Sequence, residues 1–168
     1  MNILKLSSLI GQEIAEVRFH YVPEDEYGLQ SFYAFLRLTD ETILTIPKFS
    51  DDDDYLELTP DNVSYLKRMF DTGDLVGKQV KKCLVGQKIV DFYFCYYHGE
   101  VDIDISAFIK LTNGYYLSEN NDGPIGVNNV DLILLTESEF LEKVKKLNEF
   151  GVTIRSFSEM SRLDNNKN

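Results

Sequence analysis

The sequence predicts an α+β fold made of two pseudo-symmetric ββββα repeats, with antiparallel sheets and helices packed on them. Three observations lead to this prediction. A 14-residue segment recurs, because LIGQEIAEVRFHYV begins at Leu9 and LVGQKIVDFYFCYY begins at Leu84. Alternating apolar and polar residues follow in both copies, which is the pattern of half-buried strands. Each set of strands then ends in a sequence typical of a helix start.

The repeat extends well beyond its opening. The two openings align with a shift of 75 residues. A second block, YAFLRLTDETIL from Tyr33, aligns with SAFIKLTNGYYL from Ser106 at a shift of 73, and a third block aligns Thr59 with Thr136 at a shift of 77. The insertions fall between the blocks, where surface loops join the elements. Duplication is the favoured interpretation, and a chance match of two strand-rich segments is the alternative.

The alignment also gives the domain organisation. Residues 1–168 are expected to form a single domain, because a chain of this length suits one shared core. It divides into two repeats, about 1–74 and 75–150. A C-terminal strand at GVTIRSF and a polar tail, SRLDNNKN, follow the second repeat.

Each copy is predicted to contain four antiparallel strands. The inner face of the first strand is expected to carry Val17, Phe19 and Tyr21 in one copy and Phe92, Phe94 and Tyr96 in the other. The second strand of the second copy alternates most regularly, with apolar residues at odd positions from Val101 to Leu111. Asp40-Glu41 and Asn113-Gly114 supply the next turns. Third strands are expected near 43–46 and 115–118, and fourth strands near 55–58 and 131–135.

Both fourth strands run directly into a predicted helix. Thr59-Pro60 places a capping hydroxyl before a proline at the first helical position. Thr136 and Glu139 have the spacing of a capping box. The apolar stripes that would face the sheets are Val63, Leu66, Met69 and Phe70 in one helix and Phe140, Val144 and Leu147 in the other. Gly73 and Gly151 are expected to end these helices.

The composition limits the classes of function. Its 17 Lys and Arg residues against 28 Asp and Glu residues give a net charge of −11. That charge repels nucleic acid and anionic membranes and attracts a basic partner or cations, although simple solubility accounts for it equally well. Two cysteines do not make a disulfide framework, and no apolar run approaches the roughly 20 residues of a membrane span. We therefore expect a cytoplasmic protein with reduced cysteines.

No catalytic motif is present in the sequence. The two histidines, His20 and His98, belong to no metal-binding spacing, and the Gly-x-Ser-x-Gly elbow is missing. The glycines form neither a dinucleotide-binding loop nor a Walker loop. The Gly-Gln pairs of the repeat are instead expected to shape a turn before each first strand. We expect neither enzyme activity nor a cofactor.

Acidic clusters are the most conspicuous polar feature. One is an unbroken run in a predicted loop, formed by Asp51, Asp52, Asp53 and Asp54. This run fits a solvated loop, a protein-binding surface or a cation site. A calcium loop of the EF-hand type needs a glycine that FSDDDDYLEL lacks.

A second acidic cluster lies on a predicted strand. Glu100, Asp102 and Asp104 share its outer face, with Lys110 further along the same face to relieve part of their repulsion. The first copy has uncharged residues at the matching positions. This face is therefore the first candidate for a partner-binding patch, the Asp run is the second, and random drift of an exposed surface is the alternative.

Two classes of function remain open. In the first, an acidic surface with ten Tyr residues in the chain captures a basic protein, since tyrosine gives contact area at low entropic cost. In the second, the protein is an enzyme or a small-ligand-binding protein with a pocket between the two repeats. The first class is preferred.

The chain resembles, in its general character, the immunity proteins of bacterial contact-dependent and polymorphic toxin systems. The shared features are small size, acidity, a single domain and the lack of a catalytic motif. The resemblance implies a neutralising partner for a basic toxin domain, often a nuclease, that covers its active site or its nucleic-acid surface. It implies no catalytic residues.

Overall fold

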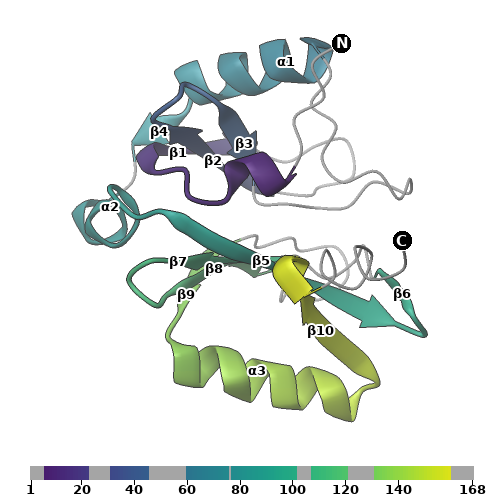
Figure 1. Ribbon diagram of the computed structural model, residues 1–168. Coiled ribbons are helices and arrows are strands. Elements are labelled where there is room, and N and C mark those ends of the chain that lie inside the picture. Colours follow the sequence, from purple (N-terminus) through teal and green to yellow (C-terminus); the bar gives the residue numbers. More distant parts are fainter. Residues whose placement is uncertain are drawn as a thin grey trace.

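The computed structural model describes residues 6–22, 31–45, 60–75, 77–101, 107–120 and 131–159. They form antiparallel sheets with helices packed on them, so the α+β prediction is confirmed. Two sheets lie between two long helices, and the layers follow the order α1, first sheet, second sheet, α3 (Figure 1). No helix within the described ranges is long and apolar enough to cross a membrane.

The first sheet is built by the first half of the chain, with the strand order β3-β2-β1-β4. The elements of this half are the 3-10 helix η1 (Leu6–Leu9), β1 (Ile14–Val22), β2 (Ser31–Leu38), β3 (Ile43–Thr45), α1 (Pro60–Asp71) and β4 (Asp74–Leu75). The strand β4 follows the helix and returns to pair with β1.

The second sheet has the order β10-β5-β7-β8-β9, and β6 also pairs with β5. The elements of the second half are α2 (Lys78–Leu84), β5 (Ile89–Tyr97), β6 (Glu100–Val101), β7 (Phe108–Leu111), β8 (Tyr116–Asn120), β9 (Asp131–Leu135), α3 (Glu137–Glu149) and β10 (Val152–Ser156). Here too the strand after the helix, β10, pairs with the first strand of its half, β5.

The strand registers of the two halves correspond at the shifts of the sequence repeat. Ile14 pairs with Leu38 in one half and Ile89 with Leu111 in the other, and an irregularity follows each pair. The next pairing, β2 with β3, also matches that of β7 with β8. Duplication itself stays a prediction, which these matching registers support.

The repeated Gly-Gln segments pair with each other and thereby join the two halves. Glu13 and Lys88 form an isolated antiparallel bridge. The Gly11 N–H donates to the Ile89 carbonyl at 2.8 Å, and the Gly86 N–H donates to the Ile14 carbonyl at 2.8 Å. Two further bonds have the same reciprocal form, from Ile14 N–H to the carbonyl of Gln87 and from Ile89 N–H to the carbonyl of Gln12. Gly11 and Gly86 both have positive φ, 86° and 83°, so the predicted turns are present.

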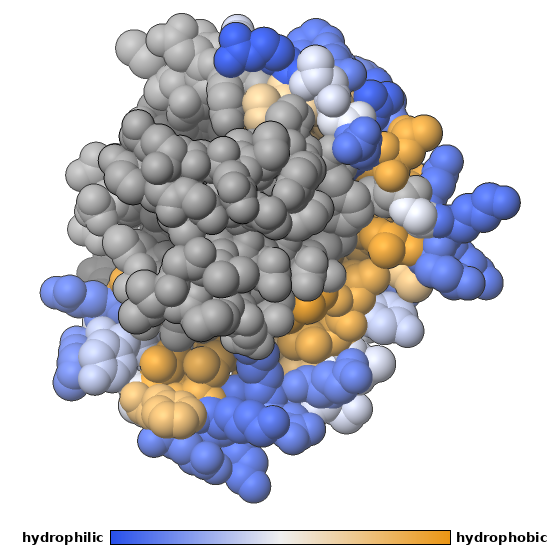
Figure 2. Space-filling model, turned by 180° about the vertical axis from the view of Figure 1, so that it is seen from behind, coloured by the Kyte–Doolittle hydropathy of each residue, from blue (hydrophilic) through white to orange (hydrophobic). Residues whose placement is uncertain are grey.

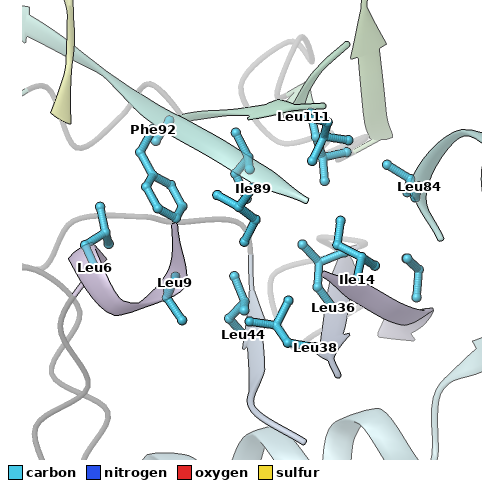
Figure 3. Close-up of a cluster of buried hydrophobic side chains, with 14 of the residues drawn as sticks. Leu6, Leu9, Ile14, Leu36, Leu38, Leu44, Leu84, Ile89, Phe92 and Leu111 are labelled. Carbon is cyan, nitrogen blue, oxygen red and sulfur yellow. The ribbon is translucent and has the colours of Figure 1, made fainter. Parts of the chain in front are cut away.

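One hydrophobic core fills the space where the two sheets face each other (Figure 3). Leu36, Leu38 and Leu44 come from the first sheet, and Ile89, Phe92 and Leu111 come from the second. All six are at most 1 % exposed. Burial of such side chains contributes roughly 1.5–3 kcal/mol each, so the two halves stabilise each other.

Each outer face is covered by a helix. Phe35 packs with Leu66 and Phe70 of α1 in a small cluster of its own. A larger cluster under α3 contains Cys95, Phe108, Tyr116, Phe140 and Val152. The sequence placed Phe108 on the outer face of its strand, where it does lie. It is nevertheless 1 % exposed, because α3 covers that face.

The predicted helix starts agree with the structure. Several short elements were not predicted from the sequence. Helix α1 begins at Pro60, and Thr136 caps α3 in a capping box with Glu139, so both predictions are confirmed. The sequence did not predict η1, α2 or β4. The strand expected near 55–58 lies outside the described residues.

The single long strand expected from Glu100 to Thr112 is wrong. Val101 pairs with Tyr96 and Phe108 pairs with Tyr93, both along the same strand, β5. Two residues separate the partners on β5, whereas six residues separate Val101 from Phe108. The second strand therefore has four residues more than regular pairing with β5 can accommodate, and β6 and β7 are separate elements.

Candidate functional site

The structure describes two of the eight residues predicted to bind a partner. Glu100 is exposed at the start of β6, and Lys110 is half-buried in β7. The other six, Asp102, Asp104, Asp51, Asp52, Asp53 and Asp54, lie outside the described residues. The two acidic patches therefore stay predictions.

Lys110 does not lie close enough to Glu100 to relieve its charge. Glu100 is opposite Tyr97, and Lys110 is opposite Asp91 on the same strand, β5. Six residues of extended chain separate these two positions by about 20 Å. The Lys110 ammonium instead lies 5.3 Å from the centre of the Tyr116 ring.

Exposed aromatic side chains gather beside Glu100. Tyr97 is 45 % exposed and Phe150, in the turn after α3, is 77 % exposed. The His98 ring contacts the Tyr97 ring with a centroid separation of 4.1 Å. We call Tyr97, His98 and Phe150 the aromatic end.

The aromatic end is formed by two adjacent turns at one end of the second sheet. Tyr97 pairs with Val152, which brings the turn between α3 and β10 next to the turn between β5 and β6. A Cβ atom at Gly151 would lie 3.5 Å from Cε2 of Tyr97, so the backbone of the first turn packs against that ring. In the view from behind, hydrophobic residues lie beside hydrophilic ones at the lower left, where this end projects (Figure 2).

Carboxylates lie next to both turns of the aromatic end. Glu100 and Glu149 are both exposed, one next to each turn. An aromatic face bordered by carboxylates suits an arginine or lysine side chain, because the ring attracts the cation and the carboxylate can pair with it. The aromatic end can therefore bind a basic side chain through ring and carboxylate contacts.

A tyrosine pair under α3 is a second polar feature. Tyr93 contacts the rings of Tyr116 and Phe140 edge to face at 5.6 and 5.2 Å. Burial raises the pKa of Tyr93 to about 12, and the neighbouring Tyr116 and Asp91 add to this effect. Asp91 Oδ1 accepts bonds from the N–H groups of Phe92 and Ser158. The bond from Ser158 attaches the chain after β10 to β5, so we assign Asp91 a structural role.

An ion-pair network occupies the matching position in the first half. Glu16 pairs with Arg37 at 2.6 Å and with Arg18 at 2.9 Å. Arg18 also donates to the Asp71 carbonyl at 3.3 Å, and its guanidinium lies 4.9 Å from the centre of the Phe70 ring. Both arginines are thus engaged in docking the C-terminus of α1 onto its sheet.

In the described part of the chain, the residue types that usually hold metals are dispersed. Within the described ranges, no three His, Cys, Asp or Glu residues are grouped closely enough to hold a metal ion. Neither Cys83 nor Cys95 is in a disulfide, and His98 lies exposed in a turn. The side chain of His20 lies outside what the structure describes.

Tyr97 and Phe150 were not among the residues predicted to bind a partner. Tyr97 continues the outer-face alternation of β5, at 91, 93, 95 and 97, so its direction was predictable. Phe150 lies three residues after Leu147, where a longer helix would turn it toward the core. The helix ends at Glu149, and the glycine at 151 was the available signal that Phe150 lies outside it.

Comparisons with known proteins leave the family open. No protein-family model matches the chain, and neither a curated protein nor a solved structure matches it.

Proposed function

We propose that this protein is a non-enzymatic binding module that captures a basic protein partner. In its full form, the proposal is an immunity protein that neutralises a bacterial toxin domain by covering its active or substrate-binding surface. The observation that supports it best is the exposed aromatic end, with Glu100 and Glu149 beside it.

The aromatic end has the composition of a contact surface. Exposed hydrophobic patches on soluble domains mark interaction sites, and aromatic residues carry much of the energy at such sites. The net charge of −11 adds long-range attraction for a basic partner and speeds its capture. Asp102 and Asp104 follow Glu100 in the sequence and add to the negative charge of this segment.

The alternative function, a small-ligand site between the two halves, has less support. The described residues of that interface pack as one hydrophobic core, in which Leu38 and Ile89 are fully buried. Their side chains occupy that part of the interface.

The direct test is capture of a partner from the native host, followed by affinity measurement with the purified partner. Tyr97→Ser with Phe150→Ser should weaken binding about 10- to 100-fold, because two aromatic contacts are lost. Leu141→Ser is the control, since Leu141 is an exposed apolar residue of α3 outside the aromatic end. The affinity of this variant for the partner should equal that of the natural protein. An unchanged affinity in the double variant would remove the aromatic end from the proposal.

The immunity function has its own test. A candidate toxin gene adjacent to this gene would be expressed with and without the protein, and growth would be measured. Growth restored by the natural protein, and restored less by a Glu100→Lys, Asp102→Lys, Asp104→Lys variant, is the expected result. Failure of the natural protein to restore growth, with no basic protein captured from the host, would overturn the proposal.

A further inference from the structure

Lysines gather at the opposite end of the second sheet from Glu100. Helix α2 and the turn after it, residues 78–88, read KQVKKCLVGQK and contain four lysines and no acidic residue. We call Lys78, Lys81, Lys82 and Lys88 the lysine patch. In a chain of net charge −11, this stretch is a local reversal of sign.

The lysines of the patch form no ion pairs with the rest of the described chain. All four lysines are exposed, and none of them makes an ion pair within the described ranges. Lys67 and Lys146, in the two long helices, do have such partners, Asp71 and Glu142. Among the described acidic residues, Glu13 lies opposite Lys88 and Asp74 precedes the helix in the sequence.

Apolar side chains border the lysine patch on both sides. Leu75 precedes it and is 76 % exposed, and Val90 follows it and is 40 % exposed. In the view from behind, this end lies at the right, where hydrophilic residues protrude next to hydrophobic ones (Figure 2). The surface thus combines positive charge with uncovered apolar area.

We infer that the lysine patch binds an acidic segment of a protein, with Leu75 and Val90 contacting apolar side chains of that segment. Lysine ammonium groups pair with carboxylates. A phosphate backbone offers no apolar side chains for Leu75 and Val90 to contact, whereas a protein segment does. Helix α2 has seven residues, about 10 Å, which is enough for a short peptide. A long polyanion would extend beyond the patch over a surface that repels it.

This surface is separate from the aromatic end, and the inference does not rest on the function proposed above. The two lie at opposite ends of the second sheet, with α2 at the left and β6 at the right (Figure 1). A basic partner at one end and an acidic segment at the other therefore do not compete. Each surface can be disabled alone.

The test uses a fluorescein-labelled ten-residue peptide of alternating Glu and Leu, measured by anisotropy at low and high salt. Binding to the natural protein should weaken at least tenfold in Lys81→Glu with Lys82→Glu. The control, Lys145→Glu with Lys146→Glu, makes the same charge change on exposed positions of α3 and should leave the affinity unchanged. Equal losses in both variants would show general electrostatic attraction and would overturn the inference.

Further probes separate the possible occupants. Leu75→Ser should reduce binding of the Glu-Leu peptide and leave binding of an all-Glu peptide unchanged, since only the first has apolar side chains. Tighter binding of a 20-nucleotide single-stranded DNA, or of vesicles with anionic lipids, than of the peptide would overturn the choice of a protein segment. Absence of peptide binding at low salt would overturn the inference as a whole.

Discussion

Glu13 and Lys88 face each other in the antiparallel bridge that joins the two sheets. Four backbone hydrogen bonds surround this bridge in two reciprocal pairs, each between 2.8 and 2.9 Å. The residues that recur most clearly in the sequence, Gly11 with Gln12 and Gly86 with Gln87, are the ones that make the junction. The positive φ at this junction accounts for the recurring glycines, whereas Gln12 and Gln87 contribute backbone carbonyls.

The junction predicts that Gly11 and Gly86 tolerate substitution poorly and to a similar degree. Gly11→Ser or Gly86→Ser places a side chain at a φ near +85°, which costs about 1–2 kcal/mol in unfolding free energy, although no atom blocks the Cβ. Gly77→Ser is the control, because Gly77 has φ −60° and lies at the N-cap of α2, where serine is favoured. Urea unfolding followed by circular dichroism measures all three. Equal stability of Gly11→Ser and Gly77→Ser would contradict the prediction.

Glu41 and Gly114 occupy matching turns, and exchanging their residue types should have opposite effects. Glu41 has φ 70°, a left-handed conformation that is unfavourable for glutamate, and Gly114 has φ 85°. Glu41→Gly removes this strain but also an exposed ion pair with Arg37, so we expect a gain of about 0.5 kcal/mol. Gly114→Glu should lose about 1 kcal/mol. Thermal unfolding of both variants tests the prediction, and a loss in each would contradict it.

Phe140 should be the residue of α3 that contributes most to stability. Its ring stacks on Tyr116 with centroids 3.9 Å apart and contacts Phe108 at 5.2 Å. Phe140→Ala should cost about 3–5 kcal/mol of unfolding free energy, because it leaves a cavity in this cluster. The neighbouring Leu141 is 58 % exposed, so Leu141→Ala should change stability by less than about 0.5 kcal/mol. Similar losses in the two variants would show that α3 does not pack on its sheet in this way.

Tyr93 predicts a loss of stability in alkali. Its pKa is raised to about 12 from an ordinary value of 10.0, so the folded protein favours the neutral phenol. The corresponding stabilisation is complete below pH 10 and is lost as the pH rises from about 10 to about 12. Tyr93→Phe cannot ionise, and its stability should fall less steeply over that range. Urea unfolding at several pH values measures this, with Tyr97→Phe as the exposed control, and identical pH profiles for Tyr93→Phe and the natural protein would refute it.

Hydrophobic periodicity and capping signals in the sequence predicted most of the fold. The alternation around Phe92 and Phe94 predicted a half-buried strand, and both side chains lie in the core between the two sheets. The hydroxyl of Thr136 marked the start of α3. Such signals are local, so a single sequence contains them.

The interruption after Val101 was not predictable from the same pattern. The four additional residues between β6 and β7 are an even number, so the alternation continues as though one strand ran through. Helix α2 was missed for a different reason. Val80, Cys83 and Leu84 do have the spacing of an apolar stripe, but a helix of seven residues is too short for that period to stand out in the sequence. Its glycine N-cap gives no side-chain signal either.

The candidate site was predictable only in part. Glu100 was selected for its charge, and its position beside Tyr97 follows from the turn at His98 and Gly99. Phe150 enters the site through the pairing of Val152 with Tyr97, a contact between residues 55 positions apart. A single sequence does not encode that pairing in any local pattern.

The bridge between Glu13 and Lys88 also sets an order of events during synthesis. The two residues are 75 positions apart, and at about 5–20 residues per second the ribosome needs roughly 4–15 s to make the intervening chain. The second sheet is made later still, because β5 to β10 all follow Lys88, and until then Val17, Leu36 and Leu44 have no second sheet to cover them. We therefore expect chaperones to bind the uncovered apolar face of the nascent N-terminal half, and aggregation to begin there.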